Sequence, residues 1–222
     1  MPMKNDREYR SFDFMKRAKD EGEESSFLVE GYASTFDEYT LGADDEAVYN
    51  ERIEPTAFDK TDMSDVVFLL DHTGRVYART KNDTVKLSVD DKGLFTQTDL
   101  SKTSASRAVY EDIEAGNYYQ MSFAFVVERN EDSQTVEQTG ETEDGKPIYT
   151  RIIKRIKKLY DISAVGFPAN PTTDIGVVTR AAFDGEIERI KAERLKEEER
   201  KREVERQRAI AKLKLLEVKN DD

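Results

Sequence analysis

The sequence has no cysteine and a single histidine among its 222 residues. The lack of cysteine excludes a disulfide framework, a thiolate zinc site and a cysteine nucleophile, and it is consistent with a reducing compartment. No apolar run approaches the roughly 18 residues of a membrane span, and the N-terminal MPMKNDREYR lacks the apolar core of a signal peptide. We therefore expect a soluble, cytosolic protein with no membrane partner.

The net charge is −12, and it is unevenly distributed. Residues 181–222 contain 12 acidic and 12 basic side chains, so the whole excess of acid lies in residues 1–180. An acidic body repels phosphate backbones, which argues against nucleic acid as a partner. Hydrophobic and charged residues each make up 37% of the chain, too polar a composition for one compact unit of this length. We expect one domain with an appendage.

Composition divides the chain into a polar, loosely held segment at 1–25, a body at 26–180 and a charged helix at 181–222. Residues 186–218 contain no glycine or proline and consist mainly of helix-forming residues. Apolar residues are too sparse there for the repeating seam of a long coiled coil. Two interpretations remain open: a solvated helix that ends in an apolar patch, or a docking or assembly segment. The patch would comprise Ile210, Leu213, Leu215, Leu216 and Val218.

Short apolar runs separated by turn residues dominate the body. Six or more such strands with one clear helix predict a small barrel or sandwich decorated by helices. We expect a loop at 129–147, a helix at 101–115, and strands at 27–32, 65–70, 85–89, 94–100, 119–127, 148–157 and 159–167.

His72 is the only histidine, so any histidine-dependent mechanism must use it. It follows the apolar run at 65–70 directly, where the end of a strand can hold a side chain rigidly. The alternative is an ordinary structural or surface histidine. With one histidine and no cysteine, only carboxylate metal sites are available, and neither an EF-hand loop nor a phosphate-binding glycine loop is present. We therefore expect no metal and no cofactor.

Ser122 lies inside the apolar strand at 119–127, where burial of a hydroxyl is costly unless it is hydrogen-bonded. An imidazole could activate this serine as a nucleophile, although a core serine bonded to the backbone fits equally well. Asp161 could orient the imidazole, or it could be an exposed aspartate at the end of a strand. No G-x-S-x-G motif supports an α/β-hydrolase. The competing acids are Asp71, Glu51 and Glu54.

Several segments together resemble the prohead protease family of tailed phages. They are Gly31-Tyr-Ala-Ser-Thr-Phe36, Glu51-Arg-Ile-Glu-Pro-Thr-Ala-Phe58, the strand that ends at Asp71-His72, Tyr119-Gln-Met-Ser122-Phe-Ala-Phe125, and Leu159-Tyr-Asp161-Ile-Ser-Ala-Val-Gly-Phe-Pro-Ala-Asn-Pro-Thr-Thr173. The last segment is the most specific. The resemblance covers roughly residues 26–179.

This resemblance implies an α+β fold similar to the herpesvirus assembly proteases: a small, mostly antiparallel β-barrel surrounded by helices, here with a long charged C-terminal helix. It implies a serine endopeptidase that enters the assembling procapsid in the host cytoplasm. Its partners would be the scaffolding protein or the scaffolding part of the major capsid protein, which it cuts, often together with itself; self-association is left open. His72 and Ser122 match the family's base and nucleophile. Asp161 stands where many relatives have glutamate and where the herpesvirus enzymes use a second histidine.

Two other classes of function compete with the protease. One is a non-catalytic scaffold or tube-like structural protein on the same barrel. The other is a partner-binding module in which the C-terminal helix acts and the barrel is a carrier. A tube protein has no reason to keep the histidine, serine and acid in the family's order, and a binding module would lose its function with residues 181–222 but not with Ser122→Ala.

Overall fold

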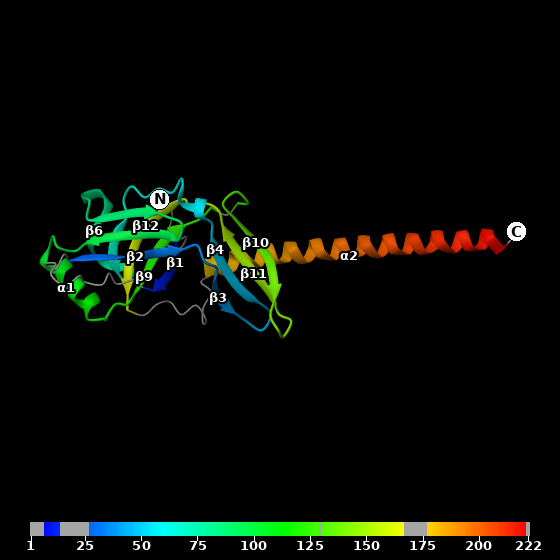
Figure 1. The fold of residues 1–222 in the computed structure, drawn as a ribbon, viewed down its shortest axis with the longest axis horizontal. Helices are drawn as coiled ribbons and strands as arrows, with labels where there is room; N and C mark the ends of the chain where they lie inside the picture. Colours follow the sequence, from blue (N-terminus) through cyan, green and yellow to red (C-terminus); the bar gives the residue numbers. More distant parts are fainter. Residues whose placement is uncertain (1–6, 14–26, 129, 167–176, 221–222) are drawn as a thin grey trace.

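The computed structural model describes residues 7–13, 27–128, 130–166 and 177–220; at 11–13, 177–182 and 211–220 it describes the backbone alone. The strands gather in one body, and a single long helix leaves that body as a rod (Figure 1). Within the described residues the strands form sheets of five, four and three members. This agrees with the predicted α+β class and with the predicted long C-terminal helix.

The five-stranded sheet carries the residues singled out from the sequence. Its neighbouring strands are antiparallel except β12 and β5, which run parallel. β9 has a strand on either side, and its residues from Met121 onwards are buried. In spatial order the members are β1 (Glu8–Asp13), β9 (Gln120–Val126), β12 (Lys158–Val165), β5 (Val67–Leu70) and β6 (Thr73–Arg79).

The three-stranded sheet contains the predicted hairpin. β8 (Gly93–Asp99) pairs with β7 (Val85–Val89) and, on its other side, with β2 (Leu28–Thr35). A Cβ atom at Gly93 would lie 2.0 Å from the carbonyl oxygen of Ser34, so only glycine allows β2 to approach here. The predicted helix follows as α1 (Ser104–Glu114), capped at its N-terminus by the Thr103 side chain.

The long helix packs against the four-stranded sheet. In order it comprises β10 (Gln134–Glu141), β11 (Pro147–Ile153), β4 (Val48–Ile53) and β3 (Tyr39–Ala43). α2 (Val177–Asn220) buries Phe183 and Ile187 against this sheet, and the Phe183 ring meets Tyr49 edge to face at 5.1 Å. Burial of one such phenylalanine contributes about 2 kcal/mol.

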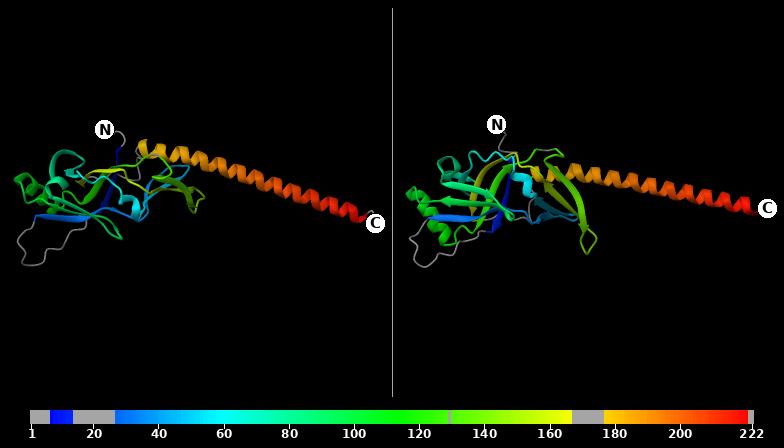
Figure 2. Two further views of the ribbon diagram at one scale, coloured as in Figure 1. Left: turned by 90° about the horizontal axis from the view of Figure 1, so that it is seen from above. Right: turned by 45° about the horizontal axis from the view of Figure 1, so that its top comes forward.

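Beyond that anchor, α2 is a solvated helix. In both views of Figure 2 the helix extends away from the sheets as a rod. All side chains at 191–210 are exposed, and ion pairs one turn apart, such as Arg189 with Glu193, occur along the helix. The predicted apolar patch lies outside the described side chains, apart from the exposed Ile210. Among the described residues, no helix is long and apolar enough to cross a membrane.

The predicted closed barrel is wrong for the described part of the chain. No ladder there joins β6 to β7, the strand that follows it; the short 3₁₀ turn η3 (Thr80–Asn82) separates the two strands. The Thr84 hydroxyl accepts the Arg79 amide hydrogen, and Thr80 donates to the Val66 carbonyl. The Thr84 side chain thus occupies an amide group of β6 that a closing ladder would use, whereas the Thr80 bond lies on the side of β5.

Five strands lie where the sequence analysis expects none: β1, β3, β4, β6 and β10. Two of them show the reason. The predicted loop at 129–147 contains β10, which pairs with β11 in a hairpin. Only Val136 of β10 is buried, so the strand has no apolar alternation to reveal it. The N-terminal segment contains β1, whose six residues pair with β9. The prediction that residues 1–25 are loosely held is therefore wrong for Glu8–Asp13, because pairing and buried charge hold this segment.

Candidate active site

His72 occupies the second position of a two-residue turn between β5 and β6. Asp71 and His72 have φ angles of 47° and 57°, a left-handed pair that hairpin turns of this length require. Non-glycine residues adopt this conformation at a cost on the order of 1 kcal/mol each. The Asp71 amide donates to the Ala164 carbonyl at 3.1 Å, and its carboxylate accepts the Gly166 amide hydrogen at 3.2 Å. These bonds tie the turn to the end of β12.

Ser122 lies in the middle of β9, with Ser11 of β1 opposite on one side and Ser163 of β12 on the other. Its neighbours Met121 and Phe123 point into the main core, so the hydroxyl points to the opposite face. Only 1% of Ser122 is exposed. Its Oγ lies 2.6 Å from His72 Nε2, which gives this buried hydroxyl a hydrogen-bond partner.

A β-bulge aims Asp161 at the same face. Leu159 and Asp161 stand opposite consecutive residues of β9, so Tyr160 is the extra residue. Regular alternation would place Leu159 and Asp161 on one face. The bulge instead sends Leu159 into the core and leaves Asp161 with Ser163 on the side of Ser122.

The Asp161 carboxylate completes a chain of hydrogen bonds through the imidazole. Its Oδ1 lies 2.5 Å from His72 Nδ1. An ionised carboxylate only accepts, so Nδ1 carries the hydrogen and Nε2 of the neutral ring is free to accept from Ser122. The Asp161 carboxylate is thus positioned to stabilise the imidazolium that forms when His72 takes up a proton.

The competing acids lie elsewhere. Asp71 is exposed and bonded to Gly166, and Glu51 belongs to a buried charge cluster with arginines. No polar contact between Glu54 and His72 is found in the described part of the chain. Of the four candidate acids, only Asp161 contacts the histidine.

The sequence analysis missed two residues at this site. Ser163 donates to Asp161 Oδ1 at 2.9 Å and lies 3.3 Å from His72 Nδ1. Its spacing of two residues from Asp161 on a strand is a signal that could have identified it. The Tyr9 ring packs edge to face on His72, with centroids 4.5 Å apart. Tyr9 comes from the N-terminal segment, and no local pattern connects it with His72.

The arrangement fits metal-free acyl transfer: a hydroxyl, a base and an acid in one hydrogen-bonded line. Across the described ranges, no group of three histidine or acidic side chains could hold a metal ion. The residues from Phe167 to Thr173, which end the predicted motif, lie outside the described part of the chain.

Comparison with known proteins identifies the family of the chain. The family model described as caudovirus prohead serine protease matches residues 12–186, a span that includes His72, Ser122 and Asp161. No curated protein and no solved structure matches the chain. The match covers well over half of the sequence and agrees with the resemblance seen in its motifs. The chain therefore belongs to the caudovirus prohead serine protease family.

Proposed function

We propose that this protein is a serine endopeptidase in which Ser122 is the nucleophile, His72 the general base and acid, and Asp161 the acid that orients the imidazole. One observation carries the proposal: His72 bonds Ser122 Oγ through Nε2 and Asp161 Oδ1 through Nδ1, at 2.6 and 2.5 Å. Membership of a family of phage serine proteases supports it independently.

The first half of the reaction follows from the positions of these atoms. Ser122 Oγ attacks the scissile carbonyl carbon while His72 Nε2 takes the hydroxyl proton. The Asp161 carboxylate stabilises the resulting imidazolium. When the tetrahedral intermediate collapses, the imidazolium gives its proton to the leaving amine, and the acyl group stays on Ser122. A water molecule then attacks the acyl group in the same way, with His72 again as base and acid, and the carboxylic acid product leaves Ser122.

The substrates are phage proteins of the assembling procapsid. We propose that the enzyme cuts the scaffolding protein or the scaffolding part of the major capsid protein, inside the procapsid in the host cytoplasm. We also propose a distant relationship between its body, residues 26–180, and the herpesvirus assembly proteases.

The C-terminal extension at 181–222 is a second proposed substrate, cut by the enzyme from itself. Its long exposed helix has few contacts with the body beyond Phe183 and Ile187, which favours its release or its use in docking. Mass spectrometry of purified protein should show loss of a C-terminal fragment in wild type and an intact chain in Ser122→Ala. Equal fragmentation of both proteins would contradict self-cleavage.

Co-expression with the capsid and scaffolding proteins of the same phage tests the main function. We expect cleavage with wild type and none with Ser122→Ala, a loss of about 10⁵-fold or more in rate. Ser88→Ala, which alters an exposed serine on β7, is the matched control and should cleave normally. Cleavage by wild type and Ser122→Ala alike, or by neither, would contradict the proposed mechanism and favour a non-catalytic assembly protein.

A further inference from the structure

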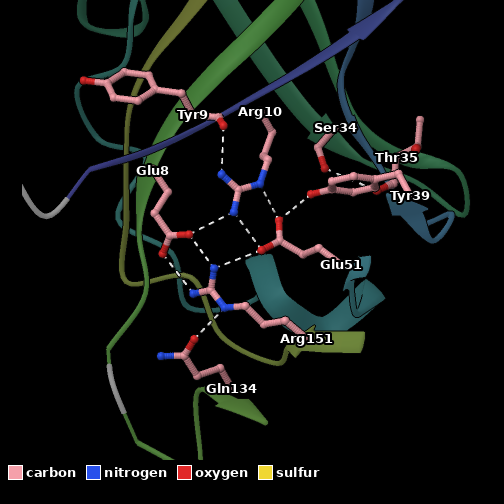
Figure 3. A network of polar contacts seen from close by, with 9 residues as sticks. All are labelled: Glu8, Tyr9, Arg10, Ser34, Thr35, Tyr39, Glu51, Gln134 and Arg151. Carbon is pink, nitrogen blue, oxygen red and sulfur yellow. Dashed lines mark hydrogen bonds and ion pairs between the residues drawn. The ribbon is translucent and has the colours of Figure 1, made fainter. Parts of the chain in front are cut away.

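β1 presents different chemistry on its two faces. Glu8 and Arg10 are buried, whereas Tyr9 between them is 38% exposed. This is the alternation expected of a strand. The Tyr9 ring points away from the cluster of charges that surrounds its two neighbours (Figure 3). The strand therefore separates a buried ionic cluster from the face that carries His72 and Ser122.

The ionic cluster contains two arginines and two glutamates, so its charges balance. Arg10 bonds both carboxylate oxygens of Glu51, at 2.6 and 2.8 Å, and reaches Glu8 at 3.0 Å. Arg151 bonds Glu8 and Glu51 from the other side, each at 2.9 Å. The Tyr39 hydroxyl donates to Glu51 at 2.5 Å. The cluster thereby joins β1 of the five-stranded sheet to β3, β4 and β11 of the four-stranded sheet.

Glu8, Arg10 and Arg151 remain charged inside the protein. Burial alone would raise the pKa of Glu8, but Arg151 and Arg10 outweigh it and lower that pKa to about 2. Burial would lower the pKa of Arg10, but Glu51, the Tyr39 oxygen and Glu8 raise it. A fully paired set of buried charges resists displacement, because moving one member leaves the others unpaired.

The cluster holds the backbone of Tyr9 directly. Arg10 Nη1 donates to the Tyr9 carbonyl oxygen at 2.8 Å (Figure 3). On the opposite face, Tyr9 stands across from Ala124, two residues along β9 from Ser122. Its ring lies at 64° to the imidazole of His72 with a centroid distance of 4.5 Å. One strand thus connects the ionic cluster to the candidate base.

His72 needs such support for a geometrical reason. Each ring nitrogen is held by a single short hydrogen bond, to Asp161 or to Ser122, and the ring is joined to the backbone through two rotatable side-chain bonds. Its backbone is in a strained turn, and 16% of the side chain is exposed. A ring packed edge to face restricts this rotation and contributes about 1 kcal/mol.

We propose that Tyr9 is a positioning residue for His72, and that the ionic cluster on the other face of β1 holds Tyr9 in place. The inference rests on the proposed function, since the positioned group is its base. The family match begins at residue 12, so Tyr9 and two of the four charged residues precede it. The N-terminal strand therefore helps to position the candidate base.

A small fluorophosphonate probe tests this role, because it reacts with Ser122 without having to occupy a peptide-binding subsite. Ser122 Oγ forms a bond to phosphorus, the P–F bond breaks, fluoride leaves, and His72 Nε2 takes the hydroxyl proton. We expect Tyr9→Ala to lower the labelling rate constant by about 10- to 100-fold and Tyr9→Phe to keep it within about twofold. Tyr119→Ala removes a tyrosine that is more exposed than Tyr9, at 51% against 38%, and that directly precedes β9; it should label like wild type.

The single histidine allows a second readout that does not depend on activity. The imidazole C–H signals of an NMR spectrum belong to His72 alone. Loss of the Tyr9 ring current should move them in Tyr9→Ala but not in Tyr9→Phe or Tyr119→Ala. On a peptide substrate, Tyr9→Ala should lower kcat and leave KM near its wild-type value.

The cluster is tested by Glu51→Gln and by Tyr39→Phe, which removes one donor to Glu51 and no charge. Both should slow labelling of the folded protein, Glu51→Gln more than Tyr39→Phe. Wild-type labelling of both folded variants would overturn the role of the cluster.

The other outcomes separate this inference from the proposed function. Equal labelling of wild type and Tyr9→Ala would overturn the positioning role alone, as would a rise in KM with kcat unchanged, which would make Tyr9 a substrate contact. Absence of Ser122-dependent labelling in wild type would overturn the proposed function, and the positioning role with it.

Discussion

Two polar clusters lie on opposite faces of the strands β1 and β9, and they are built differently. The His72 cluster is a line in which Ser122 and Asp161 each contact one nitrogen of a partly exposed imidazole. The Glu51 cluster is a closed network of four charges whose side chains are at most 9% exposed. The imidazole of the line is partly exposed, with 16% of its side chain accessible, whereas the network is enclosed by other side chains. Under the proposed function, buried charge serves rigidity on one face, and a sparsely bonded line serves chemistry on the other.

The two clusters also differ in backbone conformation. His72 has a positive φ in a tight turn, whereas the charged residues come from regular strands. Strain concentrated at a site is tolerated only where surrounding contacts determine the conformation. The comparison predicts that changes in the line alter activity and spare stability, and that changes in the network lower stability and, through Tyr9, activity as well.

The largest effect is expected from Asp161→Asn. The amide keeps the shape of the carboxylate but can donate to Nδ1, which favours the wrong imidazole tautomer and no longer stabilises the imidazolium. We expect kcat for capsid or scaffold cleavage to fall by about 10⁴-fold. Thermal unfolding should stay near the wild-type midpoint. A variant that cleaves normally would remove Asp161 from the mechanism. A variant that unfolds would contradict the expectation that changes in the line spare stability.

Glu51→Gln tests the network. The substitution leaves Arg10 and Arg151 buried with one negative charge fewer, so we expect the free energy of unfolding to fall by about 3–5 kcal/mol. Urea denaturation measures this change. Glu137→Gln, an exposed residue on β10, is the matched control and should stay within about 0.5 kcal/mol of wild type. Equal stability of both variants would show that the network does not hold the sheets together.

Acid should weaken the network through Glu8. The folded-state pKa of Glu8 is lowered from 4.5 to about 2, so its contribution is present above the unfolded value and is lost as pH falls toward 2. The shift corresponds to about 3 kcal/mol. Urea denaturation at pH 7, 4 and 2.5 should therefore give a steeper loss of stability in wild type than in Glu8→Gln. Parallel curves would contradict this assignment.

The smallest effect is expected from an exposed ion pair of the same sheet. Arg79 bonds Asp65 at 2.8 Å, but both side chains are substantially exposed. We expect Asp65→Asn to cost less than about 1 kcal/mol and to lose that effect at high salt. A loss as large as that of Glu51→Gln would mean that burial does not explain the difference between the clusters.

Some elements could be predicted because local chemistry specifies them. The hairpin of β7 and β8 follows from alternation and a turn, and α1 follows from its apolar period and the Thr103 cap. β10 and β1 lack these signals, because pairing with β11 and with β9 decides them. The sequence also could not show that the barrel is not closed, because closure depends on which backbone groups the turn near Thr84 binds.

The sequence by itself determined which side chains are available for chemistry at the site. With one histidine and no cysteine, a serine mechanism had to use His72, and the motifs around Ser122 and Asp161 pointed to the family. Only the tertiary structure decided which acid meets the imidazole, because a bulge at Tyr160 sets the face of Asp161. It also decided that Tyr9 packs on His72, since contacts between residues distant in sequence arise from strand pairing and buried charge, which no local pattern records.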